Sequence, residues 1–129
     1  REFTFCETLL NDSIKTIPVL KLKYCFIALT KEGLSNVSKH SNATKVVITL
    51  SEDEKNYYYS FCDNGTVDET TKLSILKSQA CSEYTDGIGL QSMYDRVKSF
   101  HGLFQIDTKT GFQIYITIPK EDTNESTNN

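Results

Sequence analysis

The sequence predicts an α+β fold in which helices cover one face of a β-sheet. A long apolar segment with helical spacing occupies residues 18–40, and two alternating strand-like segments follow it at 45–62. A second helical segment at 90–100 is followed by another strand pair at 103–118. Because each of these elements has one apolar side, the helices and the sheet are expected to bury those sides against each other.

The bulk composition fits one domain and excludes several classes of function. The chain has 129 residues, 38% hydrophobic and 24% charged, which is typical of a soluble globular protein. We expect one domain at residues 1–120 and a disordered polar tail at 121–129. No apolar run approaches the ~18 residues of a membrane helix. A net charge of -3 without a basic stripe argues against binding to nucleic acid.

Cysteines and glycosylation sequons give little functional signal. No Cys-x-x-Cys pair occurs, so reduced, mostly buried thiols are favoured over a zinc site or a disulfide framework at Cys6, Cys25, Cys62 and Cys81. Asn-x-Ser/Thr tripeptides begin at Asn11, Asn36, Asn42, Asn64 and Asn124. In a chain this rich in Asn, Ser and Thr, we interpret them as chance occurrences.

The first half of the chain predicts a helix followed by a hairpin. Apolar residues recur mostly every three or four positions at Leu20, Leu22, Phe26, Leu29, Gly33 and Val37. Pro18 suits a first helical turn, and Ser41-Asn42 suits a stop. Residues 45–50 and 57–62 are rich in β-branched and aromatic side chains around a polar turn, which predicts two paired strands. A short strand is also expected at residues 2–6.

The second half of the chain predicts a helix and a hairpin again, without a detectable sequence repeat of the first half. About twenty residues after Gly65 show only a short helical pattern around Leu73 to Leu76, and a connection of that length is usually functional or mobile. Leu90, Met93, Val97 and Phe100 then predict a helix that ends at His101-Gly102. Residues 103–107 and 112–118 alternate around a Thr-Lys-Thr-Gly turn and predict a second hairpin.

Three polar residues of the first helix fall on one face. Glu32, Asn36 and Lys39 stand at i, i+4 and i+7, which places their side chains within roughly 60° of each other. The ordinary interpretation is a solvated helix face. However, these residues interrupt a helix that is otherwise apolar nearly all round, and buried polar groups require a partner or a purpose.

Two further motifs could meet a ligand. Asp63-Asn64-Gly65 places a carboxylate and a glycine at a strand end, although the same residues also form ordinary turns. Gly87-Ile88-Gly89 precedes a helix, where glycines let the backbone approach phosphate oxygens. The dinucleotide fingerprint and the phosphate-loop motif are both missing, as are zinc ligands and a nucleophile with a partner base.

Together and in this order, the segments KEGLSNVSKHSNATKVVITL, YSFCDNG, DGIGLQSMYDRVKSFHGLFQID and GFQIYITIP resemble the catalytic domain of bacterial sensor histidine kinases. These kinases belong to the GHKL ATPase superfamily, and the likeness is greatest to the DesK and NarX-like subfamily. It covers about residues 17–119. The resemblance implies a two-layer α/β sandwich, the Bergerat ATP-binding fold, with a mixed sheet covered on one face by helices and a lid over ATP.

The resemblance also implies residue roles at the phosphate end of a bound nucleotide. Glu32 matches the catalytic carboxylate that polarises or accepts a proton near the γ-phosphate. Asn36 matches the asparagine that ligates Mg²⁺, a metal that prefers oxygen ligands and keeps several waters. Lys39 and His40 match positions that meet phosphate oxygens, whose charge must be neutralised during phosphoryl transfer.

Other roles concern the base and the lid. Asp63 matches the aspartate that accepts a hydrogen bond from the adenine amino group, and Gly65 lets the strand end pass close to the base. Thr117 matches a supporting position on the adjacent strand. The lid hinge is implied at Gly87, Gly89 and Leu90, and the twenty-residue segment before it would cover ATP.

The implied function is binding of ATP with Mg²⁺ and transfer of the γ-phosphoryl group to a histidine in two-component signalling. The acceptor would lie in the dimerisation domain of the same kinase, outside this chain, since neither His40 nor His101 suits that role. A response regulator would then receive the phosphoryl group. The parent kinase is expected to be a membrane-anchored homodimer with this domain in the cytoplasm.

Two alternatives remain open. A degenerate GHKL module could keep the fold and act as a regulatory interaction domain with weak or no catalysis. Val67 favours this alternative, because the family usually has glycine there, and it predicts a stiffer lid or weaker nucleotide binding. A serine-directed kinase of the same superfamily would need the same nucleotide site with a different acceptor.

Overall fold

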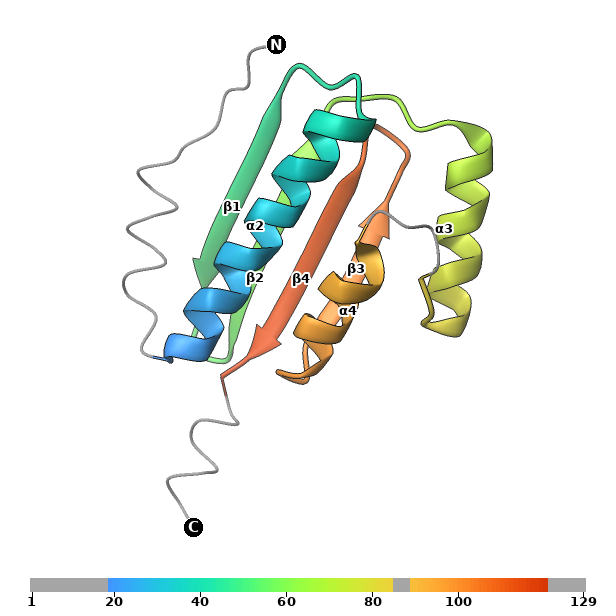
Figure 1. Cartoon of the computed structure of the whole chain (residues 1–129). Coiled ribbons are helices and arrows are strands. Elements are labelled where there is room, and N and C mark those ends of the chain that lie inside the picture. Colours follow the sequence, from blue (N-terminus) through green and yellow to red (C-terminus); the bar gives the residue numbers. More distant parts are fainter. Residues whose placement is uncertain (1–18, 85–88, 121–129) are drawn as a thin grey trace.

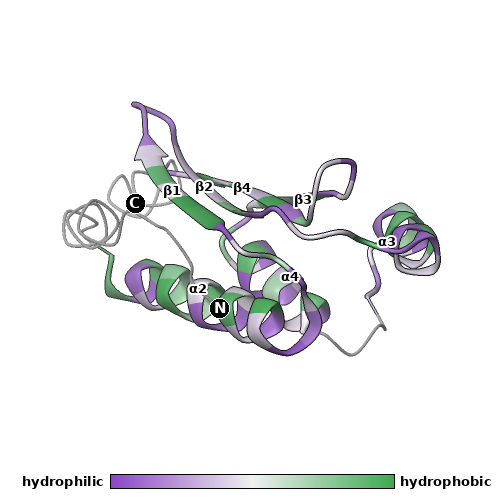
Figure 2. Ribbon diagram, turned by 90° about the horizontal axis from the view of Figure 1, so that it is seen from above, coloured by the Kyte–Doolittle hydropathy of each residue, from purple (hydrophilic) through white to green (hydrophobic). Residues whose placement is uncertain are grey.

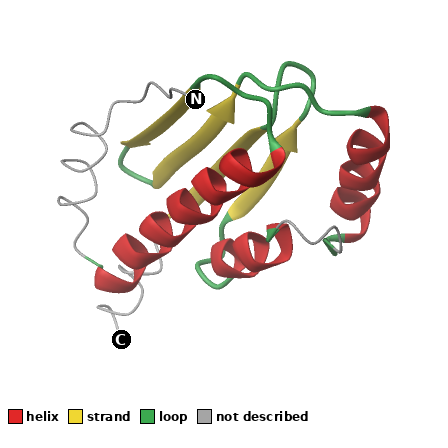
Figure 3. Ribbon diagram, turned by 45° about the horizontal axis from the view of Figure 1, so that its top comes forward, coloured by secondary structure: helices red, strands yellow, loops and turns green. Residues whose placement is uncertain are grey.

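The computed structural model describes residues 19–84 and 89–120. Its elements are, in chain order (Figures 1 and 3), α2 (Leu20–His40), β1 (Val46–Glu52), β2 (Asn56–Asp63), α3 (Glu69–Cys81), α4 (Leu90–Lys98), β3 (Leu103–Asp107) and β4 (Gln113–Pro119). Both predicted helices and both predicted hairpins are present. Within these described ranges, no helix combines the length and the apolar character needed to cross a membrane.

The sheet has the strand order β1-β2-β4-β3 among the described residues. Each hairpin pairs its own strands, and β2 pairs with β4 at the centre, where Tyr57 lies opposite Ile118 and Phe61 opposite Ile114. All three pairings are antiparallel, so the mixed sheet implied by the family likeness is not found in this part of the chain. The reason is that each short turn forces antiparallel pairing and the two hairpins meet with opposite strand directions. The strand expected at residues 2–6 lies outside the described residues.

The fold has two layers. Figure 2 shows α2 and α4 on one side of the sheet, and none of the helices in residues 19–84 and 89–120 covers its other face. Alternate side chains of β2 point into the layer between them, and Phe26 of α2 stacks on Tyr59 with ring centroids 5.5 Å apart. The residues with the largest fully buried side chains are Phe26, Phe61, Ile75, Leu90, Met93, Ile118, Val46 and Val97. The predicted α+β architecture, with helices over one face, is therefore confirmed.

The segment expected to be mainly a long loop contains the 13-residue helix α3. Asp68 caps its N-terminus by accepting a hydrogen bond from Thr71 N at 2.8 Å. The helix stands beside the edge strand β3 (Figures 1 and 2), where Gln79 Oε1 accepts a hydrogen bond from Ile106 N at 2.9 Å. Its periodicity was weak because it buries only Ile75 and Ser78.

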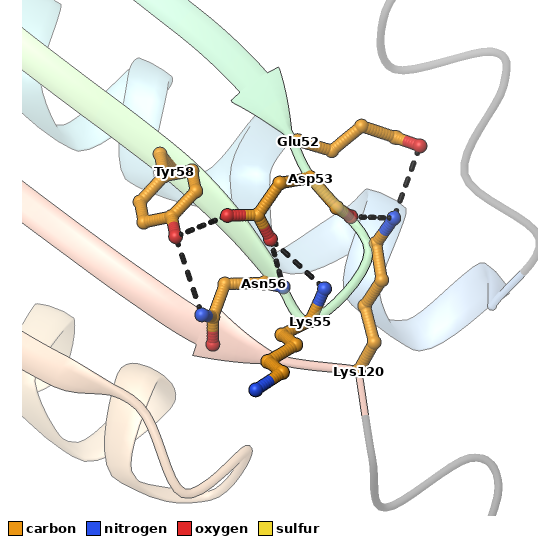
Figure 4. Close-up of polar contacts among 6 residues, drawn as sticks. All are labelled: Glu52, Asp53, Lys55, Asn56, Tyr58 and Lys120. Carbon is orange, nitrogen blue, oxygen red and sulfur yellow. Dashed lines mark hydrogen bonds and ion pairs between the residues drawn. The ribbon is translucent and has the colours of Figure 1, made fainter.

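Lys120 closes the end of the sheet opposite to Asp63 (Figure 4). Its Nζ donates to Glu52 Oε1 at 3.0 Å and to the backbone oxygen of Asp53 at 2.7 Å. Its backbone N–H donates to Lys55 O at 2.8 Å. These contacts tie the residue after β4 to the turn between β1 and β2, so this end of the sheet is fixed by its own hydrogen bonds.

Candidate functional site

A pocket of about 280 Å³ lies where β2 ends. Its walls come from the C-terminal half of α2, the strand ends of the central pair and the segment leading into α3. The lining residues are Gly33, Asn36, Val37, His40, Ser41, Phe61, Asp63, Thr66, Val67, Asp68, Thr71, Phe112 and Ile114. Three residues singled out in the sequence, Asn36, His40 and Asp63, therefore meet in one concave site.

Asp63 is the buried carboxylate of this pocket, with 6% of its surface exposed. Its Oδ1 accepts hydrogen bonds from Gly65 N at 2.8 Å and from Phe112 N at 3.2 Å. Its own backbone N–H donates to Phe112 O at 3.0 Å. Within residues 19–84 and 89–120, no hydrogen bond to Oδ2 is found. One oxygen is thus held by the backbone, while the other retains its capacity to accept a hydrogen bond from a ligand.

Glycines allow the chain to close around Asp63. A Cβ at Gly65 would lie 2.6 Å from Ser41 Oγ and 3.0 Å from Asn42 Oδ1. Gly111 has a φ of 104°, a conformation that L side chains rarely adopt, and a Cβ there would overlap the backbone oxygen of Asp63. Gly65 was singled out in the sequence. Gly111 was not, although its position in a hairpin turn was a usable signal.

Helix α2 contributes its polar face unevenly. Asn36 is half-buried and His40 exposed, and both line the pocket. Lys39 is exposed and does not line it. Glu32 is half-buried one turn before Asn36 and lies outside the lining residues. Of the three residues on the shared helix face, only Asn36 lines the pocket, whereas Glu32 lies one turn away and Lys39 is exposed.

Glu32 lies against the start of α4. Gly89, the N-cap of α4, has a φ of 79°, and a Cβ there would stand 2.7 Å from Glu32 Cδ. The carboxylate is therefore close to a helix N-terminus, where free backbone N–H groups favour negative charge.

Of the residues predicted for the lid hinge, Leu90 is fully buried and belongs to the core. Gly87 lies outside the described residues.

Thr117 is not brought into the pocket. It pairs with Tyr58 and Leu103 in the half of β4 remote from Asp63. It also lies between the buried Ile116 and Ile118, so its side chain points to the face of the sheet away from α2 and α4.

The apolar part of the pocket was not predicted from the sequence. Phe61, Phe112 and Ile114 line it beside Asp63. Phe61 stands two residues before Asp63, on the same side of β2, and this spacing could have indicated it. Val67, at the position where the resemblance led us to expect glycine, is also a lining residue.

The pocket carries a second carboxylate, at Asp68. The hydrogen bond from Thr71 N holds the pKa of Asp68 below its ordinary value, so this carboxylate is charged at neutral pH. Among the described residues, no cluster of three or more His, Cys, Asp or Glu side chains could hold a metal ion. Asn36, the predicted Mg²⁺ ligand, lines the pocket with a side chain that has an amide oxygen, and Mg²⁺ commonly takes one or two protein oxygens together with substrate phosphates and water.

No protein-family model matches the sequence, and no curated protein is significantly similar to it. Solved structures do match. The blue-light activated histidine kinase of Erythrobacter litoralis aligns over 84% of this chain with 16% identity and a TM-score of 0.64. The ATP-binding domain of PrrB from Mycobacterium tuberculosis aligns over 92% with 14% identity and a TM-score of 0.55. The histidine kinase AdeS of Acinetobacter baumannii aligns over 77% with 20% identity and a TM-score of 0.55.

These likenesses show the fold. The chain has the α+β fold of histidine-kinase ATP-binding domains, with an antiparallel sheet in the part described. It spans 33% of the length of the E. litoralis kinase and 79% of that of the PrrB domain. The structures do not single out a subfamily, so the likeness to DesK and NarX-like kinases stays a prediction.

Proposed function

We propose that this domain binds ATP with Mg²⁺ and donates the γ-phosphoryl group to a histidine on the dimerisation domain of a two-component sensor kinase. The buried carboxylate of Asp63 is the feature that carries the proposal. An adenine amino group is a hydrogen-bond donor, and Asp63 Oδ2 is a buried acceptor without a hydrogen bond from the described residues. The apolar side chains of Phe112 and Ile114 suit the faces of a base in the same pocket.

The phosphate groups would extend from this base pocket along α2. Asn36 and His40 line that side of the pocket, and Lys39 lies beside His40 on the exposed surface. Asn36 would supply an oxygen to Mg²⁺, and the metal would neutralise phosphate charge. Glu32, next to the N-terminus of α4, would accept or orient a proton near the transferred group.

A titration of ATP and ITP, each with Mg²⁺, tests the proposal. The 6-amino group of adenine donates to a carboxylate, whereas the 6-oxo group of hypoxanthine is repelled by it, so wild type should prefer ATP. Asp63→Asn keeps the shape and the Oδ1 acceptor but places an N–H donor at the second position. We expect this variant to lose at least about tenfold in ATP affinity and to lose the preference over ITP. Saturable ATP binding that is indifferent to Asp63→Asn would refute the base assignment.

The acceptor requires a separate experiment. The parent kinase, incubated with ATP labelled in the γ-phosphate, should acquire a label that is stable in alkali and labile in acid, as a phosphohistidine is. A label with the opposite stability would indicate the serine-directed alternative. No label together with intact ATP binding would contradict phosphoryl transfer.

A regulatory interaction domain remains the second candidate, and Val67 is the residue that favours it. This side chain takes up part of the pocket wall where glycine would leave room. If Val67 merely reduces affinity, Val67→Gly should tighten ATP binding. If wild type and Val67→Gly both fail to bind ATP, the regulatory candidate replaces the kinase.

A further inference from the structure

Two Asn-x-Thr segments, residues 42–44 and 64–66, bind each other reciprocally beside the pocket. Thr66 N donates to Asn42 Oδ1 at 2.9 Å, and Asn42 Nδ2 donates to Thr66 Oγ1 at 3.0 Å. In the opposite direction, Thr44 N donates to Asn64 Oδ1 at 2.9 Å, and Asn64 Nδ2 donates to Thr44 Oγ1 at 3.0 Å. Each asparagine therefore holds the backbone and the hydroxyl group of the other segment's threonine.

The middle residues of the two segments are small and buried. Ala43 is 1% exposed, and a Cβ at Gly65 would lie 3.2 Å from Ala43 N. The segments thus approach so closely that only glycine fits at position 65. This packing and the four side-chain hydrogen bonds distinguish the arrangement from a pair of independent turns, whose asparagines would bond within their own segment.

Backbone contacts connect this paired unit to the sheet. Lys45 N donates to Asn64 Oδ1 at 2.9 Å, and Asn64 N donates to Lys45 O at 3.2 Å. The first segment begins after Ser41, the C-cap of α2, and the second follows directly on β2. The paired segments therefore fix the end of the pocket-lining helix relative to the strand that carries Asp63.

The second segment also supplies the shorter of the two backbone hydrogen bonds that orient the Asp63 carboxylate. Gly65 N, in the middle of that segment, donates to Asp63 Oδ1 at 2.8 Å. Thr66, which Asn42 holds by two hydrogen bonds, lines the pocket. Movement of the segment would consequently displace both Gly65 N, which donates to Asp63, and Thr66 in the pocket wall.

We infer that Asn42 and Asn64, each hydrogen-bonded to the threonine of the other segment, are positioning residues that hold Asp63 in the orientation required for base recognition. This inference rests on the proposed function of the pocket. It gives the two sequons at Asn42 and Asn64, interpreted from sequence as chance occurrences, a structural role. The role is indirect, since Asn42 acts through Thr66 and Gly65 on Asp63.

The test uses the preference for ATP over ITP, because this ratio depends on the orientation of Asp63 and not on stability alone. Wild type, Asn42→Ala and Thr66→Val are titrated with each nucleotide and Mg²⁺ at a temperature where all are folded. We expect the ratio of the ITP Kd to the ATP Kd to fall by about three- to tenfold in Asn42→Ala. Asn42→Asp, which keeps the acceptor for Thr66 N, should retain most of the preference.

Asn56→Ala is the matched control. Asn56 also donates a side-chain hydrogen bond on the surface, to Tyr58 Oη at 3.3 Å, but at the opposite end of β2. It should leave the ratio unchanged. If Asn42→Ala does not fold, Thr66→Val and Thr44→Val each remove one hydroxyl acceptor and keep the side-chain shape, and they carry the same expectation at the lower end of the range.

The outcomes separate this inference from the proposed function. A wild type without preference for ATP contradicts the base assignment itself. A wild type that prefers ATP, with the same ratio in Asn42→Ala and Thr66→Val, overturns the positioning role alone. An equal loss of affinity for both nucleotides also overturns it, because that result indicates general loosening of the pocket.

Discussion

Gly33 of α2 faces the ring of Phe61 of β2 so closely that a Cβ at position 33 would lie 2.7 Å from Phe61 Cε2 and 2.9 Å from Cδ2 and Cζ. Both residues line the pocket, and Phe61 is 2% exposed. Phe61 stands two residues before Asp63. The missing side chain of Gly33 therefore determines where the ring lies and how closely α2 packs on the strand that carries the buried carboxylate.

Gly33→Ala should destabilise the fold and weaken nucleotide binding. The methyl group forces the ring to move, and overpacking of this kind costs about 1–3 kcal/mol, partly offset by roughly 1 kcal/mol of helix propensity. Urea unfolding and ATP titration measure the two effects. In Gly33→Ala/Phe61→Leu the smaller leucine side chain should leave room for the methyl group. The double variant should therefore lose less unfolding free energy than the sum of the losses in the single variants. Additive losses would show that the two side chains do not compete for space.

Local patterns in the sequence were sufficient for most of the fold. The apolar spacing of α2 predicted a helix at 18–40, and the structure has Leu20–His40. The alternation of both strand pairs likewise predicted the hairpins. Helix α3 was mostly missed because it buries only Ile75 and Ser78, so its sequence carries little periodic signal.

The candidate site was predictable where chemistry shows in the residue type. Asn36 was identified as a polar group on an apolar helix, Asp63 as a carboxylate at a strand end and His40 through the family resemblance. The structure brings all three into one pocket. Spacing along the helix placed Lys39 with them but could not show which part of the shared face the pocket would use. Contacts between loops, such as that of Asn42 with Thr66, depend on tertiary packing and cannot be predicted from the helical or strand spacing of apolar residues.

Asp53 should contribute stability that is lost in acid. Its carboxylate accepts hydrogen bonds from Tyr58 Oη at 2.7 Å and from the N–H groups of Asn56 and Lys55 at 2.8 and 2.9 Å, and these lower its pKa (Figure 4). A depressed pKa in the folded state gives stability above the unfolded pKa, about 3.9, that disappears as pH falls through the folded value. Urea unfolding of Asp53→Asn should therefore depend less steeply on pH below about pH 4 than wild type.

Glu54→Gln serves as the control for Asp53→Asn. It removes the same charge from an exposed position in the same turn. It should leave the pH dependence of unfolding close to that of wild type. Equal effects of the two variants would attribute the acid sensitivity to net charge and not to the hydrogen bonds of Asp53.

The cysteines should differ widely in reactivity. Burial raises the pKa of Cys25 to about 11, so at pH 8 only about one thiol in 1,000 is ionised. Cys62 is half-buried with a raised pKa, and Cys81 is exposed, which corrects the expectation of mostly buried thiols for that residue. Alkylation at pH 8 with peptide mapping should label Cys81 first, Cys62 more slowly and Cys25 only on unfolding. Labelling of Cys25 at the rate of Cys81 in folded protein would contradict the packing of α2.

The contact between Gly89 and Glu32 should appear as a coupling between the two positions. Gly89→Ala costs roughly 1–2 kcal/mol because an L side chain is unfavourable in this left-handed conformation, and displacement of the flexible Glu32 side chain adds a smaller cost. The unfolding free energy should therefore fall by about 2 kcal/mol. Adding Glu32→Ala removes the clash and leaves the backbone cost, so the double variant should recover part of the loss in urea unfolding. Gly111→Ala is the control, because its clash is with the backbone oxygen of Asp63 and Glu32→Ala cannot relieve it. Recovery in both backgrounds, or in neither, would show that Glu32 does not rest on Gly89 in solution.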